Sequence, residues 1–218
     1  MTAIPSRAQR VRVGICDYGV GNLRSVERAI ECSGAAAVIS DDAAVLSGCD
    51  GLILPGVGAF AVAAAALRER GLDAAVHAMV ERRRPLLGIC LGFQLLFTDS
   101  EEGDGARGLD IIAGHVRRLR PGGAKVPHMG WNRLHMHRPS VLLGGVDEGE
   151  HVYFVHSYAA DVDAPSAVVA STDHGGAVVA AVEFGEVMGT QFHPEKSGAI
   201  GLRLYANFTA ACALTATA

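Results

Sequence analysis

Cys90 lies in a Gly-x-Cys-x-Gly pattern, between Gly88 and Gly92, where an apolar run meets a helix-like segment. Small residues on both sides of a nucleophile allow a strained turn between strand and helix to push the side chain outward. Such a turn aims the amides and the positive dipole end of the following helix at the sulfur. Most free cysteines are buried core residues, but this spacing predicts that Cys90 is a nucleophile.

A histidine that could activate this thiol lies near the C-terminus, in "GTQFHPEKSG". His193 ends a predicted strand, Pro194 fixes the backbone after it, and Glu195 follows on the loop. A carboxylate on one imidazole nitrogen fixes the tautomer and supports the imidazolium, which leaves the other nitrogen for the thiol. Alone, the segment would be read as a loop histidine beside a solvated glutamate. Together with Cys90 it predicts a Cys-His-Glu triad.

Attack of a thiolate on a carbonyl also requires donors for the oxyanion. The backbone N–H of Leu91, directly after Cys90, is the first predicted donor. The second is the amide of Val57 in "PGVGAF", where Gly56 and Gly58 let the backbone turn toward a small ligand. The loop lacks the lysine and Ser/Thr of a phosphate loop, and by itself it would be a plain glycine-rich turn.

The elements that must position these residues alternate between strand and helix in the first half of the chain. Strands that are apolar throughout and separated by helices predict a parallel sheet covered on both faces. Ligands of such sheets bind beyond the carboxyl ends of the strands, where Cys90 falls. Strands are expected at 11–17, 51–56 and 85–90, and helices after Asn22, over 59–67 and over 72–83.

Short strands joined by turns fill the second half and predict a mixed or antiparallel extension of the sheet. A final helix carries Ile200, Leu204 and Phe208 at i, i+4 and i+8. The predicted fold class is therefore α/β, with an open, mostly parallel central sheet flanked by helices. One domain is expected over residues 11–218, after a flexible tail at 1–10. The later strands are expected within 113–120, 131–137, 151–160, 166–172, 177–185 and 187–193.

The composition is that of a globular protein, with 50% hydrophobic and 19% charged residues, and the net charge of -4 argues against nucleic acid as a partner. The longest apolar run, at 59–67, is too short for a membrane span, which needs roughly 18 residues. Five cysteines without paired spacing argue against disulfides and predict a cytoplasmic protein. The other four are expected to be core residues: Cys16, Cys32, Cys49 and Cys212.

His135 and His137 lie at i and i+2 on one face of a predicted strand, a spacing that could hold a metal ion. No third ligand is apparent, so an exposed strand face is the preferred interpretation. No metal and no cofactor are expected.

The segments "PGVGAF", "GICLGFQ" and "FHPEKS", in this order, resemble the motifs of the class I, or triad, glutamine amidotransferases. The resemblance covers nearly the whole chain and implies the fold of that family. It implies release of ammonia from glutamine through a glutamyl thioester. Cys90 would be the nucleophile, His193 the general base and acid, and Glu195 the orienting carboxylate.

The same resemblance implies a glutamine site. Gln94 is similar to the family glutamine that contacts the substrate, and the backbone at Ser157 and Tyr158 corresponds to the segment that holds the α-carboxylate. Glu102 would face the α-ammonium, unless its acidic loop is simply solvated. The implied glutamine-binding residues are Gly56, Gly58, Gln94, Glu102, Ser157 and Tyr158.

Two further segments, "KVPHMGWN" at 125–132 and "DYGVGNLRSV" at 17–26, resemble one branch of the family, the glutaminase subunits of imidazole glycerol phosphate synthases. That branch implies a heterodimer with a (β/α)₈-barrel cyclase, which uses the ammonia to make imidazole glycerol phosphate and AICAR ribotide in histidine biosynthesis. Trp131 would then contact the partner, although a lone tryptophan in such a segment could also be a core residue. The predicted interface comprises Asn22, Lys125, Pro127, His128, Met129, Trp131 and Lys196.

Two alternatives stay open. The chain could be the glutaminase subunit of another synthase, such as the anthranilate or pyridoxal phosphate systems, although "PGVG" and "KVPHMGWN" argue against this. It could also be a non-catalytic thiol sensor, with Cys90 oxidised instead of acylated. A sensor has no need for the His-Pro-Glu segment.

Overall fold

The structure, a computed structural model, describes residues 10–120 and 122–216. Of the predicted tail at 1–10, residues 1–9 lie outside the described residues. Arg10 is exposed and its Nε donates a hydrogen bond to the Gly34 carbonyl (2.7 Å). Within the described ranges, no helix combines the length and the apolar character that crossing a membrane requires.

A central sheet of eight strands confirms the predicted α/β class with a mixed extension. Its first five strands are parallel, and the remaining three are antiparallel to their neighbours. Because these five strands run in the same direction, their carboxyl ends form one edge at which loops can assemble a site. The strands, in sheet order, are β2 (Ala36–Ser40), β1 (Arg12–Cys16), β3 (Gly51–Leu54), β4 (Leu86–Ile89), β14 (Val187–Thr190), β13 (Ala177–Phe184), β12 (Val168–Asp173) and β9 (His135–Met136).

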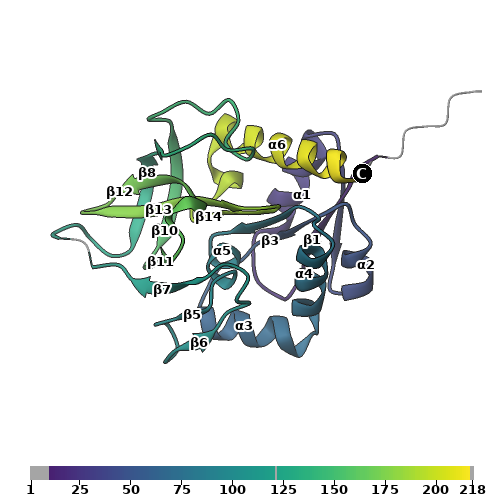
Figure 1. Cartoon of the computed structure of the whole chain (residues 1–218), viewed down its shortest axis with the longest axis horizontal. Helices are drawn as coiled ribbons and strands as arrows, with labels where there is room; N and C mark the ends of the chain where they lie inside the picture. Colours follow the sequence, from purple (N-terminus) through teal and green to yellow (C-terminus); the bar gives the residue numbers. More distant parts are fainter. Residues whose placement is uncertain (1–9, 121, 217–218) are drawn as a thin grey trace, which may run out of the picture.

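Helices cover both faces of this sheet, as Figure 1 shows. Buried residues of α1 and α6, such as Ile30 and Phe208, belong to one hydrophobic cluster. Buried residues of α3 and α4, such as Phe60 and Met79, belong to a second cluster on the other side. The helices are α1 (Leu23–Cys32), α2 (Ala43–Ser47), α3 (Phe60–Glu69), α4 (Leu72–Glu81), α5 (Leu91–Leu95) and α6 (Gly198–Ala216).

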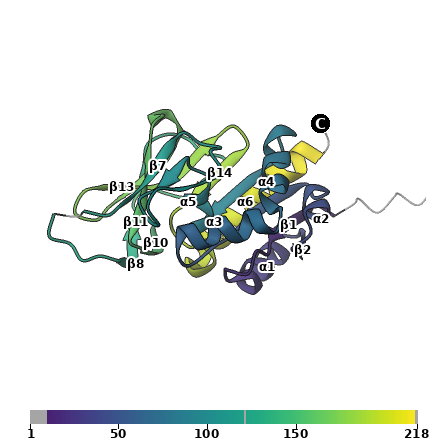
Figure 2. The ribbon, with the colours of Figure 1, turned by 90° about the horizontal axis from the view of Figure 1, so that it is seen from below.

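The remaining strands gather at one end of the molecule, away from α1 and α2 (Figure 2). They form one sheet of four strands and one antiparallel pair, and two short 3₁₀ turns complete the described elements. The four-stranded sheet has the order β11 (Tyr158–Val162), β7 (Gly114–Arg118), β5 (Asp99–Ser100) and β6 (Ala106–Arg107). The pair is β10 (His151–His156) with β8 (His128–Arg133), and the turns are η1 (Pro165–Ala167) and η2 (Pro194–Lys196).

The structure adds detail at three places, and at one of them, Cys32, the expectation of a core residue is wrong. Asn22 precedes α1, but its side chain makes no capping hydrogen bond. Cys32 is exposed and not part of the core, because it lies off the stripe of α1 that Val26 and Ile30 bury. The helix after Cys90 is short and ends at Leu95.

The junction of β4 and α5 is packed so tightly that glycine is required there. A Cβ on Gly92 would collide with the backbone carbonyl of Leu54 in β3. A Cβ on Gly88 would lie 2.8 Å from the Cα of Phe93. Because both collisions are with backbone atoms, no side-chain rotation can relieve them.

We expect Gly92→Ala to lower the free energy of unfolding by about 1–3 kcal/mol or more, since the added methyl group forces β3 and α5 apart. Gly122→Ala is the matched control, because a Cβ at Gly122 meets nothing within 4 Å. Urea unfolding of both variants measures the effect. Equal stabilities for the two variants would contradict the packing described for the junction.

Candidate active site

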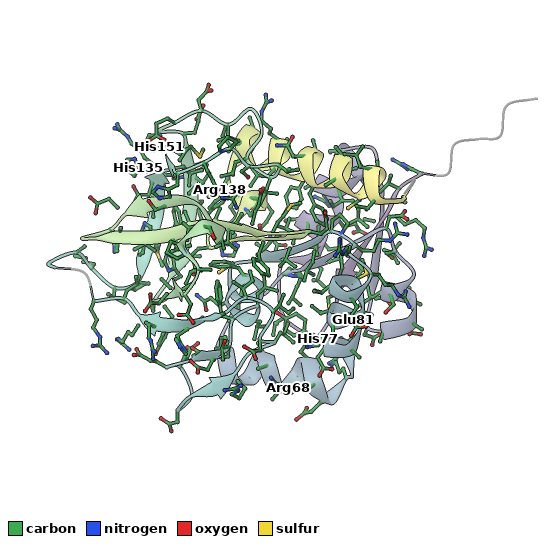
Figure 3. The ribbon with its side chains drawn as sticks, viewed as in Figure 1. Arg68, His77, Glu81, His135, Arg138 and His151 are labelled. Atoms are coloured by element: carbon green, nitrogen blue, oxygen red, sulfur yellow. The ribbon has the colours of Figure 1, made fainter. Side chains whose placement is uncertain are left out.

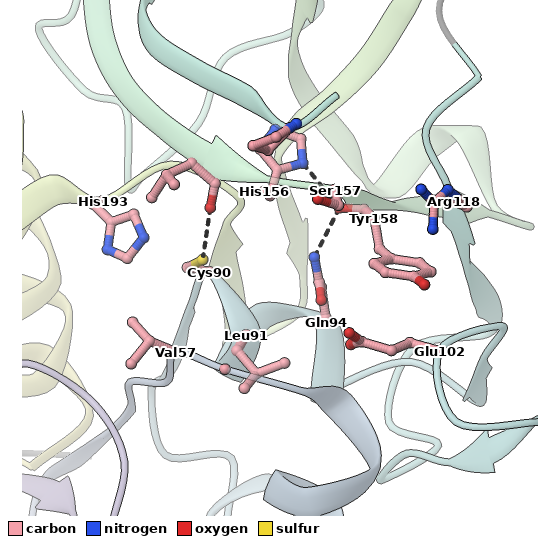
Figure 4. Close-up of a pocket in the computed structure, with 13 residues that line it drawn as sticks. Val57, Cys90, Leu91, Gln94, Glu102, Arg118, His156, Ser157, Tyr158 and His193 are labelled. Atoms are coloured by element: carbon pink, nitrogen blue, oxygen red, sulfur yellow. Dashed lines mark hydrogen bonds between the residues drawn. The ribbon is translucent and has the colours of Figure 1, made fainter. Parts of the chain in front are cut away.

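The neighbouring strands β4 and β14 bring Cys90 and His193 to the same edge of the sheet. Their parallel register sets Gly88 beside Gly189 and Ile89 beside Thr190. Cys90 directly follows β4, and His193 comes three residues after β14 ends. Both side chains line one cavity of about 540 Å³, shown in Figure 4.

Cys90 occupies a strained turn, as the Gly-x-Cys-x-Gly pattern predicts. Its φ of 53° and ψ of -105° lie outside the regions that a residue with a side chain prefers. The turn is held because its N–H donates to the Thr190 carbonyl (2.8 Å) while α5 starts at the next residue. Strain that the surroundings enforce in this way is typical of functional sites.

His193 is fixed from several sides. Its backbone N–H donates to the Tyr153 carbonyl (2.9 Å), and its own carbonyl accepts from the Ser197 hydroxyl (2.7 Å). The ring Nδ1 lies 2.8 Å from Oε1 of Glu195, and both side chains are almost completely buried. Because a carboxylate accepts, Nδ1 carries the proton of the neutral ring. Among the described residues, Nε2 has no hydrogen-bond partner, so it is free to serve Cys90 and a substrate.

The electrostatics of His193 differ from those of an ordinary buried histidine. Burial lowers the pKa of its ring, but interactions with Cys90 and Glu195 outweigh burial and raise that pKa to about 9. The imidazolium is therefore stabilised at neutral pH.

Three other cysteines are unreactive by comparison. Burial raises the pKa of Cys16 and of Cys212 to about 12, and it also raises the pKa of Cys49. These thiols remain protonated at neutral pH, as expected for core residues.

The predicted oxyanion donors are not both available in this conformation. The N–H of Leu91 donates to the Gly56 carbonyl (3.3 Å). In a trans peptide the C=O and the N–H point in opposite directions, so the N–H of Val57 faces away from Leu91. The oxyanion site is therefore closed by the peptide that was predicted to build it.

The cavity gathers most of the predicted substrate residues. Nε2 of Gln94 donates to the Tyr158 carbonyl (2.9 Å). One carboxylate oxygen of Glu102 accepts from the N–H of Phe60 at the start of α3 (2.8 Å), so this side chain is positioned and not simply solvated. Gly56, also a predicted substrate residue, is not among the residues that line the cavity, and a Cβ there would collide with the Tyr18 hydroxyl. The predicted residues that line the cavity are Val57, Gly58, Cys90, Leu91, Gln94, Glu102, Ser157, Tyr158 and His193, with Pro127 from the predicted interface.

Three residues near the site were missed from the sequence. Gln191 is fully buried and accepts from Gln94 (2.9 Å), while its own Nε2 points at the Cys90 sulfur (3.9 Å). Arg118 and His156 line the cavity. Of the three, only Gln191 could be predicted from the sequence. It stands two residues before His193, and side chains two residues apart in an extended segment point to the same side.

Six of the seven predicted interface residues are exposed. Met129 and Trp131 are 62% and 56% exposed, although large apolar side chains are usually covered. The Trp131 ring lies 6.1 Å from that of Tyr153, and Nζ of Lys196 lies 5.7 Å from the centre of the same Tyr153 ring. We call Met129, Trp131, Tyr153 and Lys196 the docking face.

His128 is the exception, since it is only 3% exposed and cannot contact a partner directly. The alternation of β8 explains this, because side chains of successive residues point to opposite faces. Met129 and Trp131 point outward, so His128 points inward.

The histidines considered as metal ligands are accounted for by other contacts. His135 Nδ1 lies 3.0 Å from Glu148, and His137 Nε2 lies 2.9 Å from the Ser171 hydroxyl. Figure 3 shows His135 at the periphery, near His151. In residues 10–120 and 122–216, no group of three or more His, Cys, Asp or Glu side chains is arranged to hold a metal ion.

The strained thiol, the buried imidazole and the carboxylate behind it have the arrangement expected of a cysteine hydrolase or transferase, at the edge of an α/β sheet. The family model of "Glutamine amidotransferase class-I" matches residues 15–211. The chain belongs to this family of enzymes.

Its relatives include the "Imidazole glycerol phosphate synthase subunit HisH" of Geobacillus kaustophilus, which is 52% identical over 202 residues, covering 90% of this chain and 95% of the relative. The protein of the same name from Halobacterium salinarum is 51% identical over 209 residues, covering 91% and 93%.

Solved structures confirm the fold. A crystal structure described as a glutamine amidotransferase has a TM-score of 0.73 at 22% identity, covering 92% of this chain and 98% of its own. A structure described as PurLQS from Thermotoga maritima has a TM-score of 0.70 at 21% identity, covering 91% and 97%.

The pKa of His193 leads to a prediction about stability. The ring binds a proton more tightly in the folded state (pKa about 9) than in the unfolded state (about 6.5). Its contribution to stability is fully present below pH 6.5 and is lost as pH rises through about 9. Urea unfolding measures the free energy of unfolding of the native protein and of His193→Gln. The difference between the two should fall over this pH window, by no more than about 1.4 kcal/mol per pH unit. Parallel curves for the two proteins would contradict the raised pKa.

Proposed function

We propose that this protein, as one domain over residues 11–218, is the glutaminase subunit of an imidazole glycerol phosphate synthase. It hydrolyses glutamine to glutamate and ammonia, and it delivers the ammonia to a (β/α)₈-barrel cyclase in a heterodimer. The cyclase then makes imidazole glycerol phosphate and AICAR ribotide in histidine biosynthesis. The observation that carries this proposal is that Cys90 and His193 line one cavity while Glu195 lies 2.8 Å from the far side of the His193 ring, in a chain about half identical to relatives of that name.

The chemistry follows from the three side chains. The Cys90 thiolate attacks the carboxamide carbon of glutamine, and a C–S bond forms as the carbonyl oxygen becomes an oxyanion. His193 gives its Nε2 proton to the nitrogen, the C–N bond breaks, and ammonia leaves a glutamyl thioester. His193 then takes a proton from water, whose oxygen attacks the thioester and releases glutamate and the thiol. Glu195 holds the ring in one orientation throughout, and no cofactor or metal is needed.

Recognition of glutamine uses the charges and amides at the other end of the cavity. The Glu102 carboxylate would bind the α-ammonium group, and the backbone at Ser157 and Tyr158 would bind the α-carboxylate. Nε2 of Gln94 donates to the Tyr158 carbonyl (2.9 Å) and so holds this part of the backbone in place.

The closed oxyanion site suggests how the activity is controlled. A rotation of the peptide between Gly56 and Val57 would withdraw the carbonyl from Leu91 and turn the Val57 N–H toward the cavity. Such a rotation changes ψ of Gly56 and φ of Val57, and Gly56 has no side chain to restrict its part of the change. Losing one oxyanion donor typically lowers the rate on the order of 100- to 1000-fold, so the isolated subunit would be nearly inactive until its partner favours the rotated peptide.

The docking face supports a partner at this edge of the molecule. An exposed tryptophan and methionine beside an aromatic–cation contact have the composition of an interface centre. The face is joined to the catalytic loop through Ser197, whose hydroxyl accepts from the Tyr153 N–H (3.0 Å) and donates to the His193 carbonyl (2.7 Å). A partner that covers this face would shield the ammonia from water.

Neither of the two alternatives is supported as strongly as the proposed function. A glutaminase subunit of another synthase would not explain identities of 51% and 52% to subunits of imidazole glycerol phosphate synthase. A thiol sensor would not require a buried carboxylate 2.8 Å from the histidine beside the thiol. We assign the activity to the cytoplasm, as the cysteine composition predicts.

We expect Cys90→Ser to reduce glutamine-dependent synthesis by more than about a thousandfold, because the hydroxyl is a poor nucleophile here. The complex of the variant with the cyclase should still work with added ammonium salt. Cys32→Ser, at an exposed cysteine, is the matched control and should keep full activity. Glutamine-driven turnover by Cys90→Ser would refute the assignment of the nucleophile.

Trp131→Ala should weaken the complex with the cyclase about tenfold or more, while the unfolding midpoint of the free subunit changes little. Val62→Ala is the control, because Val62 is an exposed apolar side chain of α3 outside the docking face, and it should leave the affinity unchanged. Titration calorimetry measures both affinities. An unaltered affinity of Trp131→Ala with full ammonia transfer would count against the docking face.

A further inference from the structure

Two buried histidines, His156 of β10 and His128 of β8, lead from the glutamine cavity into strand β8, and the proposed reaction uses neither. His156 lines the cavity and is 6% exposed, and His128 is 3% exposed. They face each other directly across the β8–β10 pair. His128 belongs to the same strand as Met129 and Trp131 of the docking face, but it points to the opposite side of that strand.

A continuous chain of hydrogen bonds runs through these rings. Nδ1 of His156 lies 2.8 Å from the Tyr158 carbonyl, a link marked in Figure 4. Nε2 of His156 lies 2.9 Å from Nδ1 of His128. Nε2 of His128 lies 3.1 Å from Nδ2 of Asn132. The chain thus joins β8 to the backbone that would hold the substrate.

The partners determine which nitrogen carries each proton. The Tyr158 carbonyl can only accept, so His156 is protonated at Nδ1 and its Nε2 is an acceptor. Nδ1 of His128 must then donate to it, which leaves Nε2 of His128 to accept from Asn132. The orientation of Asn132 agrees, because its Nδ2 also donates to the Asp173 carbonyl (2.8 Å) and its Oδ1 accepts from the Arg133 N–H (2.8 Å).

Both rings are neutral at physiological pH, as this pattern requires. Burial lowers the pKa of His156 to about 3, and nearby His128, His174 and His193 add to that effect. Burial and the neighbouring His174 lower the pKa of His128 to about 4.

Packing keeps the His128 ring in place. It is stacked between Phe154 (centroids 4.5 Å apart) and His174 (4.1 Å). Nε2 of His174 donates in turn to the Lys125 carbonyl (2.7 Å). The ring therefore has little freedom to rotate, so its hydrogen bond to His156 depends on the position of β8, the strand that carries it.

We infer that His128 and His156 form a positioning relay, through which strand β8 sets the position of Tyr158 and hence the affinity for glutamine. The inference rests on the proposed function for the identity of the substrate. Tyr158 is sensitive to the relay because its carbonyl accepts from only two described side chains, His156 and Gln94. Loss of one leaves this carbonyl with a single side-chain donor.

Nitrogen-15 NMR of the histidine rings tests the relay in the free subunit, without any assay of activity. Both His128 and His156 should show a protonated Nδ1 and a bare Nε2, with no titration between pH 5.5 and 8. The opposite tautomer at either ring, or titration in this range, would overturn the relay whatever the substrate is.

Kinetics in the complex with the cyclase test the effect on glutamine. His128→Phe keeps the stack but has no donor, so KM for glutamine should rise about 5- to 10-fold while kcat changes less than twofold. His128→Asn, whose amide can donate to His156, should restore KM most of the way. His174→Phe keeps an aromatic ring stacked on His128. Because His174 is not part of the chain of hydrogen bonds, the KM of this variant for glutamine should equal that of the native protein.

Two further measurements separate the relay from other roles. Ammonium-dependent synthesis and the affinity for the cyclase should be unchanged in both His128 variants, because the His128 side chain does not reach the docking face. A native KM in both His128 variants, or an equal rise in His128→Asn and His128→Phe, would overturn the positioning role. If the native complex consumed no glutamine, the proposed function would fail, and the NMR result would still decide whether the relay exists.

Discussion

The parallel pairing of β4 with β14 is the constraint on which the site depends. It brings together a thiol and an imidazole that are far apart in the chain, and the ladder continues into Cys90 itself, whose N–H donates to the Thr190 carbonyl (2.8 Å). The strained turn at Cys90 persists because the elements around it pack at backbone distance. A Cβ on Gly189 of β14 would collide with the Phe93 ring, just as one on Gly92 would collide with Leu54. Close packing thus stabilises a conformation that the nucleophile would not adopt alone.

Neighbouring histidines in this structure have opposite charge preferences for a clear physical reason. Both His193 and His156 are buried, which disfavours the charged ring. His193 has the Glu195 carboxylate and the Cys90 thiol as partners, and its pKa rises to about 9. His156 has a carbonyl and a second neutral ring as partners, and its pKa falls to about 3. In the proposed mechanism, one pocket therefore holds a proton donor, His193, beside a neutral ring, His156, that positions the backbone.

Much of the site was predictable because it rests on local rules. The glycines around Cys90 and the spacing of His193 and Glu195 act within a few residues, and the order of the apolar strands predicts the parallel sheet. The prediction of His128 at the surface was wrong. The alternation of side chains along a strand predicts that it points inward, because Met129 and Trp131 point outward. Short strands such as β5 and β6, of two residues each, were missed because so few residues carry no periodic signal.

The sequence by itself determined the chemical groups and the edge of the sheet at which they meet, because residue type, local turn geometry and apolar periodicity are properties of short segments. Only the tertiary structure decided which groups touch. The contacts of Gln191 with Gln94 and Cys90, and of His128 with His156, join segments whose separation in the chain carries no local pattern. The state of the oxyanion site, with Leu91 bound to the Gly56 carbonyl, depends on the rotation of one peptide between glycines. The composition of that loop permits either orientation, and the surrounding packing selects one.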